Sequence, residues 1–230
     1  MKVKVRVKVK VRVKVRVKVK VNERYKAIIE WFEANMPVAQ SELHYSSPFE
    51  LLVAVVLSAQ CTDKRVNLVT PALFAAYPDA PAMAKATAEE VLSFIHSVSY
   101  PNAKAQHLVA MAQQLTERHQ GQVPCDEDAL VALPGVGRKT AHVVMAVLWN
   151  CPTMAVDTHI FRISERLGLT TKSKNVLQTE RQLTKYIPAE LIPKAHHWLL
   201  LHGRYVCTAR KPHCERCGLQ TYCRFFTQHN

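Results

Sequence analysis

The chain has 230 residues, of which 48% are hydrophobic, and a formal net charge of +13. Most of that charge lies in Met1–Val21, which holds ten of the 31 Lys and Arg residues and no acid, so the other 209 residues carry a net charge of +3. The apolar run Leu51–Leu57 is too short to cross a bilayer and the N-terminus has no continuous apolar segment, which argues against a membrane or secreted protein and for a cytoplasmic chain of two modest lobes.

Met1–Val21 is a low-complexity tract in which Val alternates with Lys or Arg. Period two would place the cations on one face of a strand, but ten like charges repel one another and no turn is present to form a hairpin, so disorder is an equal expectation. Attraction to DNA or to anionic membranes is one interpretation of the tract. An artificial extension or translated simple-sequence DNA is the other, and the one we favour.

The remainder of the chain has a helical pattern. Tyr25, Ile28, Ile29 and Phe32 recur at helical spacing, and Ser47–Glu50 and Thr87–Glu90 have the sequence of a capping box at a helix start. Further helices are expected over 63–75, 103–119, 126–132, 138–149, 158–167, 175–186 and 192–202. With no sign of successive strands, the predicted fold class is all-α.

A glycine-marked turn, Leu133-Pro134-Gly135-Val136-Gly137, precedes the helix expected at 138–149. Pro134 cannot extend a preceding helix, and Gly135 and Gly137 allow backbone angles that a side chain would obstruct, so two helices can meet in a tight hairpin. The unpaired backbone N–H groups at the new helix start can hold a phosphate oxygen. The motif predicts a phosphate-binding turn.

Lys139 stands at the second position of that helix. The positive end of the helix dipole and the neighbouring Arg138 both disfavour a protonated amine there, which makes the nucleophilic form more accessible. The alternative interpretation is an ordinary solvated lysine at a helix start.

Asp157 immediately precedes the helix expected at 158–167, which Gly168 should end. An aspartate at this position can cap the helix, and a cap has a fixed position. The same carboxylate is therefore suited to face Lys139 across a cleft as a catalytic group.

Four cysteines near the C-terminus form the pattern C-x6-C-x2-C-x5-C, namely Cys207, Cys214, Cys217 and Cys223. Four thiolates within so short a span suit a metal centre. Common all-cysteine zinc sites use two close pairs, whereas only one close pair occurs here, so a 4Fe–4S cluster is favoured over zinc and over disulfides or free thiols. A reducing cytoplasm also fits the other cysteines, Cys61, Cys125 and Cys151, as free thiols.

The cysteine-rich end is also the basic end, because Lys194–Asn230 contains six Lys or Arg residues and one acid, Glu215. Arg210 and Lys211 lie between the first two cysteines, where a cluster could hold them toward DNA phosphates; a generic solvated surface is the alternative. His196, His197 and His202 lie on an apolar helix and are interpreted as packed residues without a ligand role.

Both motifs, in this order and separation, resemble those of the endonuclease III family, within the helix-hairpin-helix superfamily of DNA glycosylases. The resemblance covers Glu23–Phe226 and includes the segments Ser58-Ala59-Gln60-Cys61-Thr62-Asp63, Ala155–Arg162 and His196–Tyr205. It implies that Lys139 attacks the sugar C1′ to form a Schiff base and that Asp157 assists proton transfer and stabilises the developing sugar charge. It also implies that Gln60 enters the space left by an everted base.

The resemblance further implies a two-lobed fold. A six-helix barrel would span about 41–151, and an iron–sulfur cluster domain would combine 22–40 with 152–230. DNA would lie against the groove between them, contacted by Gln60, Tyr100, Gly135, Gly137, Arg138, Arg210 and Lys211.

The implied function is base-excision repair: removal of oxidised pyrimidines from duplex DNA, followed by cleavage of the abasic site by β-elimination. We expect a monomer with one 4Fe–4S cluster and no membrane partner. Adenine-specific mismatch glycosylases lack the lysine of this motif, and a noncatalytic iron–sulfur DNA-binding protein would not need Lys139 together with Asp157.

Two departures affect the expected DNA contacts. His142 stands where the family commonly has asparagine, and Ser99-Tyr100-Pro101-Asn102 replaces a glycine-leucine-tyrosine-type loop expected to wedge into the duplex. Tyr100 would then be an aromatic wedge that stacks on an exposed base, or else a residue packed between helices.

Overall fold

The computed structural model describes residues 20–229, and the described chain is helical with no strand. The α-helices are α1 (Val21–Asn35), α2 (Pro48–Ser58), α3 (Asp63–Ala76), α4 (Ala80–Met83), α5 (Ala88–Ile95), α6 (Pro101–His119), α7 (Glu127–Val131), α8 (Arg138–Trp149), α9 (Thr158–Leu167), α10 (Val176–Tyr186), α11 (Ile192–Tyr205) and α12 (Arg224–His229). Three short 3-10 turns are added by η1 (Ala189–Leu191), η2 (Cys214–Arg216) and η3 (Gln220–Tyr222). The all-α prediction is confirmed, while the interpretation of the N-terminal tract falls almost wholly outside the described residues.

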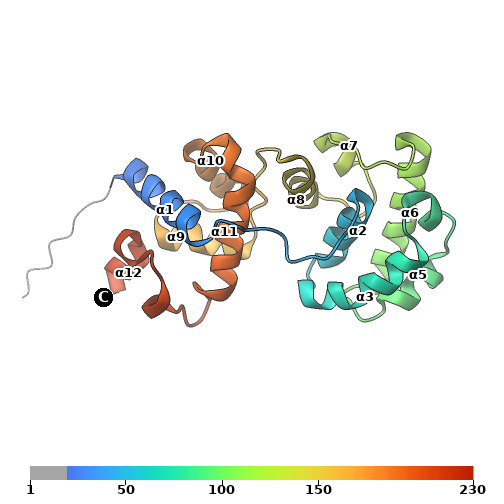
Figure 1. The fold of residues 1–230 in the computed structure, drawn as a ribbon, viewed down its shortest axis with the longest axis horizontal. Coiled ribbons are helices and arrows are strands. Elements are labelled where there is room, and N and C mark those ends of the chain that lie inside the picture. Colours follow the sequence, from blue (N-terminus) through green and yellow to red (C-terminus); the bar gives the residue numbers. More distant parts are fainter. Residues whose placement is uncertain (1–19, 230) are drawn as a thin grey trace, which may run out of the picture.

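The helices gather into two groups that lie side by side along the long axis (Figure 1). One group contains α2 to α8 and buries a core that runs in sequence from Leu43 to Val144; we call it the central lobe. The other combines α1 with α9 to α12 around a core in which Phe32 stacks on Trp198, and we call it the terminal lobe. The chain thus returns to its beginning, because α1 packs with elements more than 100 residues later.

Two interlobe connections matter for the site. The segment between α1 and α2 crosses from the terminal to the central lobe, and the segment between α8 and α9 returns (Figure 1). Arg204 of α11 reinforces the first crossing, because its Nη1 atom lies 2.7 Å from Oε2 of Glu42 and 2.5 Å from Oδ2 of Asp63. The lobes are therefore joined by charge pairs as well as by chain.

The observed helix boundaries agree closely with the predicted ones where the sequence contains a capping residue or a helix breaker. The capping box at Thr87 is complete, since the Glu90 side chain also accepts from the Thr87 backbone N–H. The box expected at Ser47 is half wrong: Ser47 caps the Glu50 N–H, but the Glu50 carboxylate accepts from Ser46 instead. Ser46 offers both its N–H and its hydroxyl, which together outcompete the single expected donor.

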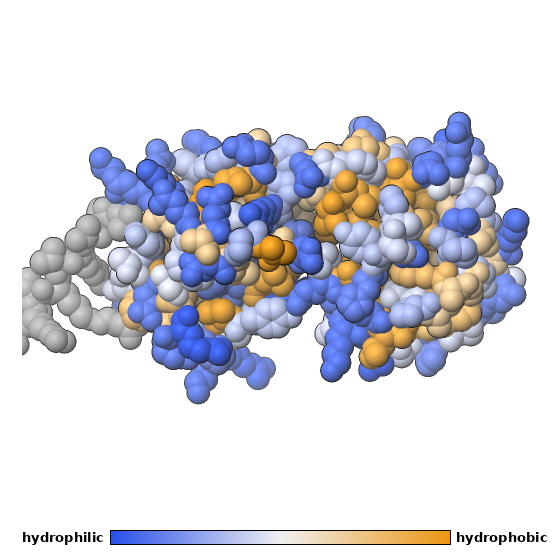
Figure 2. Space-filling view, viewed as in Figure 1, coloured by the Kyte–Doolittle hydropathy of each residue, from blue (hydrophilic) through white to orange (hydrophobic). Residues whose placement is uncertain are grey.

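The surface in Figure 2 is hydrophilic over most of this face, with apolar patches separated by polar residues. Within the described residues no helix is both long and apolar enough to span a bilayer.

Candidate active site and iron–sulfur centre

The hairpin turn needs a glycine at one of its two glycine positions and not at the other. Gly135 has φ +77°, and a Cβ atom there would lie 2.9 Å from Cβ of His107, so no side chain fits. Gly137 has φ −94°, and a Cβ atom would meet nothing within 4 Å. The expectation that a side chain at Gly137 would be obstructed within the protein is wrong; Gly137 instead leaves open space at the start of α8.

Lys139 lies in the first turn of α8, with its side chain exposed. The adjacent Arg138 is bound by carboxylates from both lobes. Its guanidinium makes two hydrogen bonds to Glu180 of α10, at 2.7 and 2.8 Å, and a third to Glu127 of α7 at 3.2 Å. These partners neutralise Arg138 and hold the start of α8 against the terminal lobe, so the charge of Arg138 acts less on Lys139 than the sequence alone indicates.

Asp157 caps α9 as predicted. Its Oδ1 atom accepts from the Ile160 N–H at 2.8 Å, and Gly168 ends the helix in the left-handed conformation with φ +80°. The aspartate is partly buried, and the cap leaves its second carboxylate oxygen without a hydrogen bond in the described structure. A carboxylate that is fixed at one oxygen can present the other in a defined direction.

A cavity of about 150 Å³ between the lobes brings the predicted residues together. Lys139 lines it from the central lobe, Asp157 from the segment before α9, and Gln60 from the turn after α2. His196 and Leu200 of α11 contribute further lining. The cavity is much smaller than the roughly 300–1,000 Å³ of drug-sized ligand sites, and its size suits one small ring.

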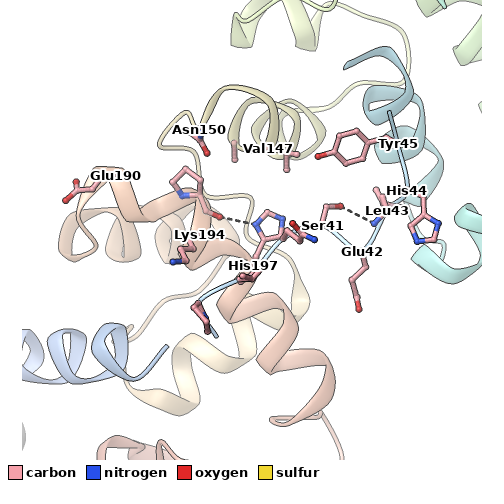
Figure 3. Close-up of a pocket in the computed structure, with 16 residues that line it drawn as sticks. Ser41, Glu42, Leu43, His44, Tyr45, Val147, Asn150, Glu190, Lys194 and His197 are labelled. Atoms are coloured by element: carbon pink, nitrogen blue, oxygen red, sulfur yellow. Dashed lines mark hydrogen bonds between the residues drawn. The ribbon is translucent and has the colours of Figure 1, made fainter. Parts of the chain in front are cut away.

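A second cavity of about 860 Å³ shares residues 40–43 and His197 with the first. Figure 3 shows its lining, which comes from the crossing segment at Ser41–Tyr45, from the end of α8 at Val147 and Asn150, and from Lys194 and His197 of α11. His197 is fixed there because its Nδ1 atom lies 3.0 Å from the Pro193 carbonyl oxygen. Although larger, this cavity contains neither Lys139 nor Asp157, so the smaller one is the better candidate for chemistry.

Gln60 and Tyr100 are exposed residues with left-handed backbones, at φ 53° and 55°. Such backbone angles are costly for residues with side chains and are typical of functional sites. The two turns are connected, since the Ser99 hydroxyl donates to the Gln60 carbonyl at 2.6 Å. Tyr100 is 64% exposed, which excludes the alternative of a residue packed between helices.

Lys104 supports the same pair of turns from beneath. Its buried ammonium donates to the carbonyls of Leu57 and Ala59, each at 2.7 Å, and so satisfies the end of α2 just before Gln60. Burial lowers the pKa of Lys104. The sequence analysis did not predict the supporting contacts of Lys104 and Ser99, because their partners are about 40 or more residues away. The signal for Lys104 was a lysine one turn into an otherwise apolar helix face.

All four cysteines of the C-terminal motif line one largely apolar cavity beside Leu167 and Phe225. Burial raises the pKa of Cys217 to about 11, and mutual repulsion among the thiolates adds to the rise. A cationic centre would offset this rise and keep the thiolates deprotonated. His202 adds a contact, with Nε2 lying 3.4 Å from Sγ of Cys217; burial lowers the pKa of His202 to about 4, so this imidazole is neutral.

Four thiols that line one cavity form the ligand set that a 4Fe–4S cluster requires.

Arg210 and Lys211 are exposed on the loop between the first two cysteines. Arg166 of α9 fixes the backbone just before them, donating to the carbonyls of Thr208 at 2.7 Å and Ala209 at 2.8 Å. The two cations therefore project from an anchored loop, as a phosphate-binding surface requires.

Comparison with known proteins agrees with this geometry. Residues 53–189 match the HhH-GPD superfamily of base excision DNA repair proteins, and residues 207–223, bounded by the first and last cysteines, match the iron-sulfur binding domain of endonuclease III. Endonuclease III of Rickettsia conorii is 45% identical over 199 residues, covering 86% of this chain and 94% of the relative. Endonuclease III of Escherichia coli is 46% identical over 198 residues, covering 86% and 93%.

Among solved structures, a trapped endonuclease III–DNA covalent intermediate superposes with a TM-score of 0.84 at 40% identity, covering 90% of this chain and 97% of that one. A thermostable thymine-DNA glycosylase superposes with a TM-score of 0.80 at 20% identity and shares the fold. With a shared fold, a matching cysteine segment and close relatives along nearly their whole length, this chain belongs to the endonuclease III family of base excision DNA repair proteins.

Proposed function

We propose that this protein removes oxidised pyrimidines from duplex DNA and then cleaves the abasic strand through a Schiff base on Lys139. The observation that carries the proposal is the single small cavity that an amine from one lobe and a capped carboxylate from the other line together. The solved relative trapped as a covalent complex with DNA supports an amine nucleophile in this family.

The reaction begins when the damaged nucleotide leaves the stack and exposes its C1′ atom. The Lys139 amine forms a bond to C1′ as the N-glycosidic bond breaks and the base leaves with the bonding electrons. While it is ionised, Asp157 stabilises the positive charge that develops on the sugar, and it then accepts a proton from the amine that has bonded to C1′. Ring opening gives an imine between Lys139 and C1′, and loss of a C2′ proton then expels the 3′ phosphate by β-elimination.

The DNA backbone would be held from both lobes. The turn at Gly135 and the open start of α8 at Gly137 would present N–H groups to a phosphate, and Arg210 and Lys211 would present cations from the cysteine-rich loop. Arg138 stays a predicted contact; to bind a phosphate it must share or leave Glu180. We also propose that the functional domains follow the predicted boundaries, 41–151 and 22–40 with 152–230, and that the protein acts as a monomer.

When bound, a 4Fe–4S cluster would cross-link the loop of residues 207–223 through four thiolates. We predict about four irons and matching acid-labile sulfide in anaerobically purified protein. Cys217→Ser should lose most of this iron, whereas Cys151→Ser, which alters a cysteine outside the motif, should keep it. Stoichiometric zinc without sulfide in the wild-type protein would overturn the assignment.

Tyr100 should act on base eversion and not on the later lyase step. Stacking of a base on an aromatic ring contributes roughly 1–3 kcal/mol of binding free energy. Its loss in Tyr100→Ala should therefore slow single-turnover base excision about 5- to 150-fold. Lyase action on a preformed abasic site and the melting temperature should change little, because the ring is exposed. An equal loss of both activities would remove Tyr100 from base eversion.

Three otherwise identical duplexes test the function as a whole. Strand cleavage and borohydride trapping are measured with thymine glycol, with an abasic site and with undamaged thymine at one position. The proposal expects base release and trapping on the first, trapping on the second and neither on the third. Trapping on the abasic duplex alone would leave a lyase without glycosylase activity and contradict the proposed substrate class.

A further inference from the structure

His196 is a buried histidine of α11, and one of its ring nitrogens is not satisfied by the described protein. Only 3% of the residue is exposed, and its Nδ1 atom has no hydrogen-bond partner within residues 20–229. The adjacent His197 is different, because its Nδ1 atom pairs with the Pro193 carbonyl oxygen. A buried polar atom without a partner costs stability, so its presence in the protein calls for an explanation.

His196 belongs to the proposed active site. The imidazole lines the same cavity as Lys139 and Asp157, and its ring packs edge-on against His197 with the centroids 5.0 Å apart. Burial first, and then the charges of His197, Lys139 and Arg204, lower the pKa of His196 to about 3. The ring is therefore neutral at physiological pH, with one nitrogen as donor and the other as acceptor.

A neutral imidazole can present one ring nitrogen, as donor or as acceptor, to the edge of a pyrimidine, which carries both N–H and C=O groups. It would not match a phosphate, which favours cationic partners. We propose that His196 hydrogen-bonds the everted base inside the cavity and is a specificity-determining residue for base excision. This inference rests on the proposed glycosylase function and deepens it.

The test compares His196→Leu with the wild-type protein on two duplexes, one with thymine glycol and one with a preformed abasic site. The ratio of the excision rate to the lyase rate should fall about 10-fold, because only the first substrate brings a base into the cavity. A 10-fold change corresponds to about 1.4 kcal/mol. His196→Gln, which keeps a donor and an acceptor, should recover part of that ratio.

Thermal unfolding separates this role from a packing role. His196→Leu should leave the melting temperature unchanged or raise it, since it removes an unpaired buried polar group. The matched variant His197→Leu should lower it, since it leaves the Pro193 carbonyl without its side-chain partner.

The possible outcomes distinguish the role of His196 from the proposed function. An unchanged ratio of rates for His196→Leu, or a lowered melting temperature with both activities reduced equally, would overturn the role of His196 and leave the proposed function standing. A wild-type protein that neither excises thymine glycol nor is trapped on abasic DNA would instead contradict the proposed function itself.

Discussion

Lys139→Gln should reduce borohydride-trapped complex on abasic DNA to background and slow strand cleavage by at least about 10³-fold. The reason is chemical, because an amide cannot form the imine that borohydride reduces, and among residues 20–229 no other lysine lines the cavity beside Asp157. The measurement is denaturing electrophoresis of the trapped complex under single-turnover conditions.

The fold should tolerate this change. Lys139 is exposed in the first turn of α8, and glutamine is a good helix former, so the melting temperature should move little. Lys172→Gln, at another exposed lysine far along the chain, is a suitable control that should trap normally. Undiminished trapping by a folded Lys139→Gln protein would remove Lys139 from the mechanism.

Asp157→Asn should slow turnover about 10²- to 10⁴-fold while DNA binding is retained. Asparagine caps a helix about as well as aspartate, so the hydrogen bond from the Ile160 N–H can persist when the charge is lost. Loss of the negative charge from the start of α9 should cost only about 0.3–1 kcal/mol of stability.

The matched variant Asp157→Ala removes both the cap and the charge. It should lose as much activity as Asp157→Asn but more stability, by roughly 0.5–2 kcal/mol relative to the wild type. Comparison of the two variants separates the cap from the chemistry. Near-normal single-turnover cleavage by Asp157→Asn would reject the proposed role of the carboxylate.

Local signals in the sequence were sufficient for most helices. The predicted span 138–149 is that of α8, because Pro134 and Gly135 break the preceding helix and apolar residues then recur at helical spacing. The cap at Asp157 and the end at Gly168 likewise follow from local preferences. The four-residue α4 and the 3-10 turns were not predicted, since they are too short to show a period.

Long-range contacts could not be predicted from the sequence. Arg138 was predicted to act on Lys139 through its charge and to contact DNA, but Glu180, 42 residues later, binds it in the fold. The support of the Gln60 turn by Lys104 and the missing partner of His196 also depend on which side chains tertiary packing brings together. The chemistry of single residues was enough to predict the amine, the carboxylate and the thiols. The further residues that support or adjoin them are determined by tertiary packing.

The most direct test of the central claim is to identify the residue that carries the trapped sugar. Met1–Val21 contains the terminal amine and ten Lys or Arg side chains. The terminal amine and the lysine amines are chemically able to form imines with an abasic site. After borohydride trapping, nuclease treatment and proteolysis, mass spectrometry should find the sugar remnant on the peptide that contains Lys139. A remnant on Met1 or on the lysines of the N-terminal tract, with Lys139 unmodified, would contradict the assignment of Lys139 as the nucleophile.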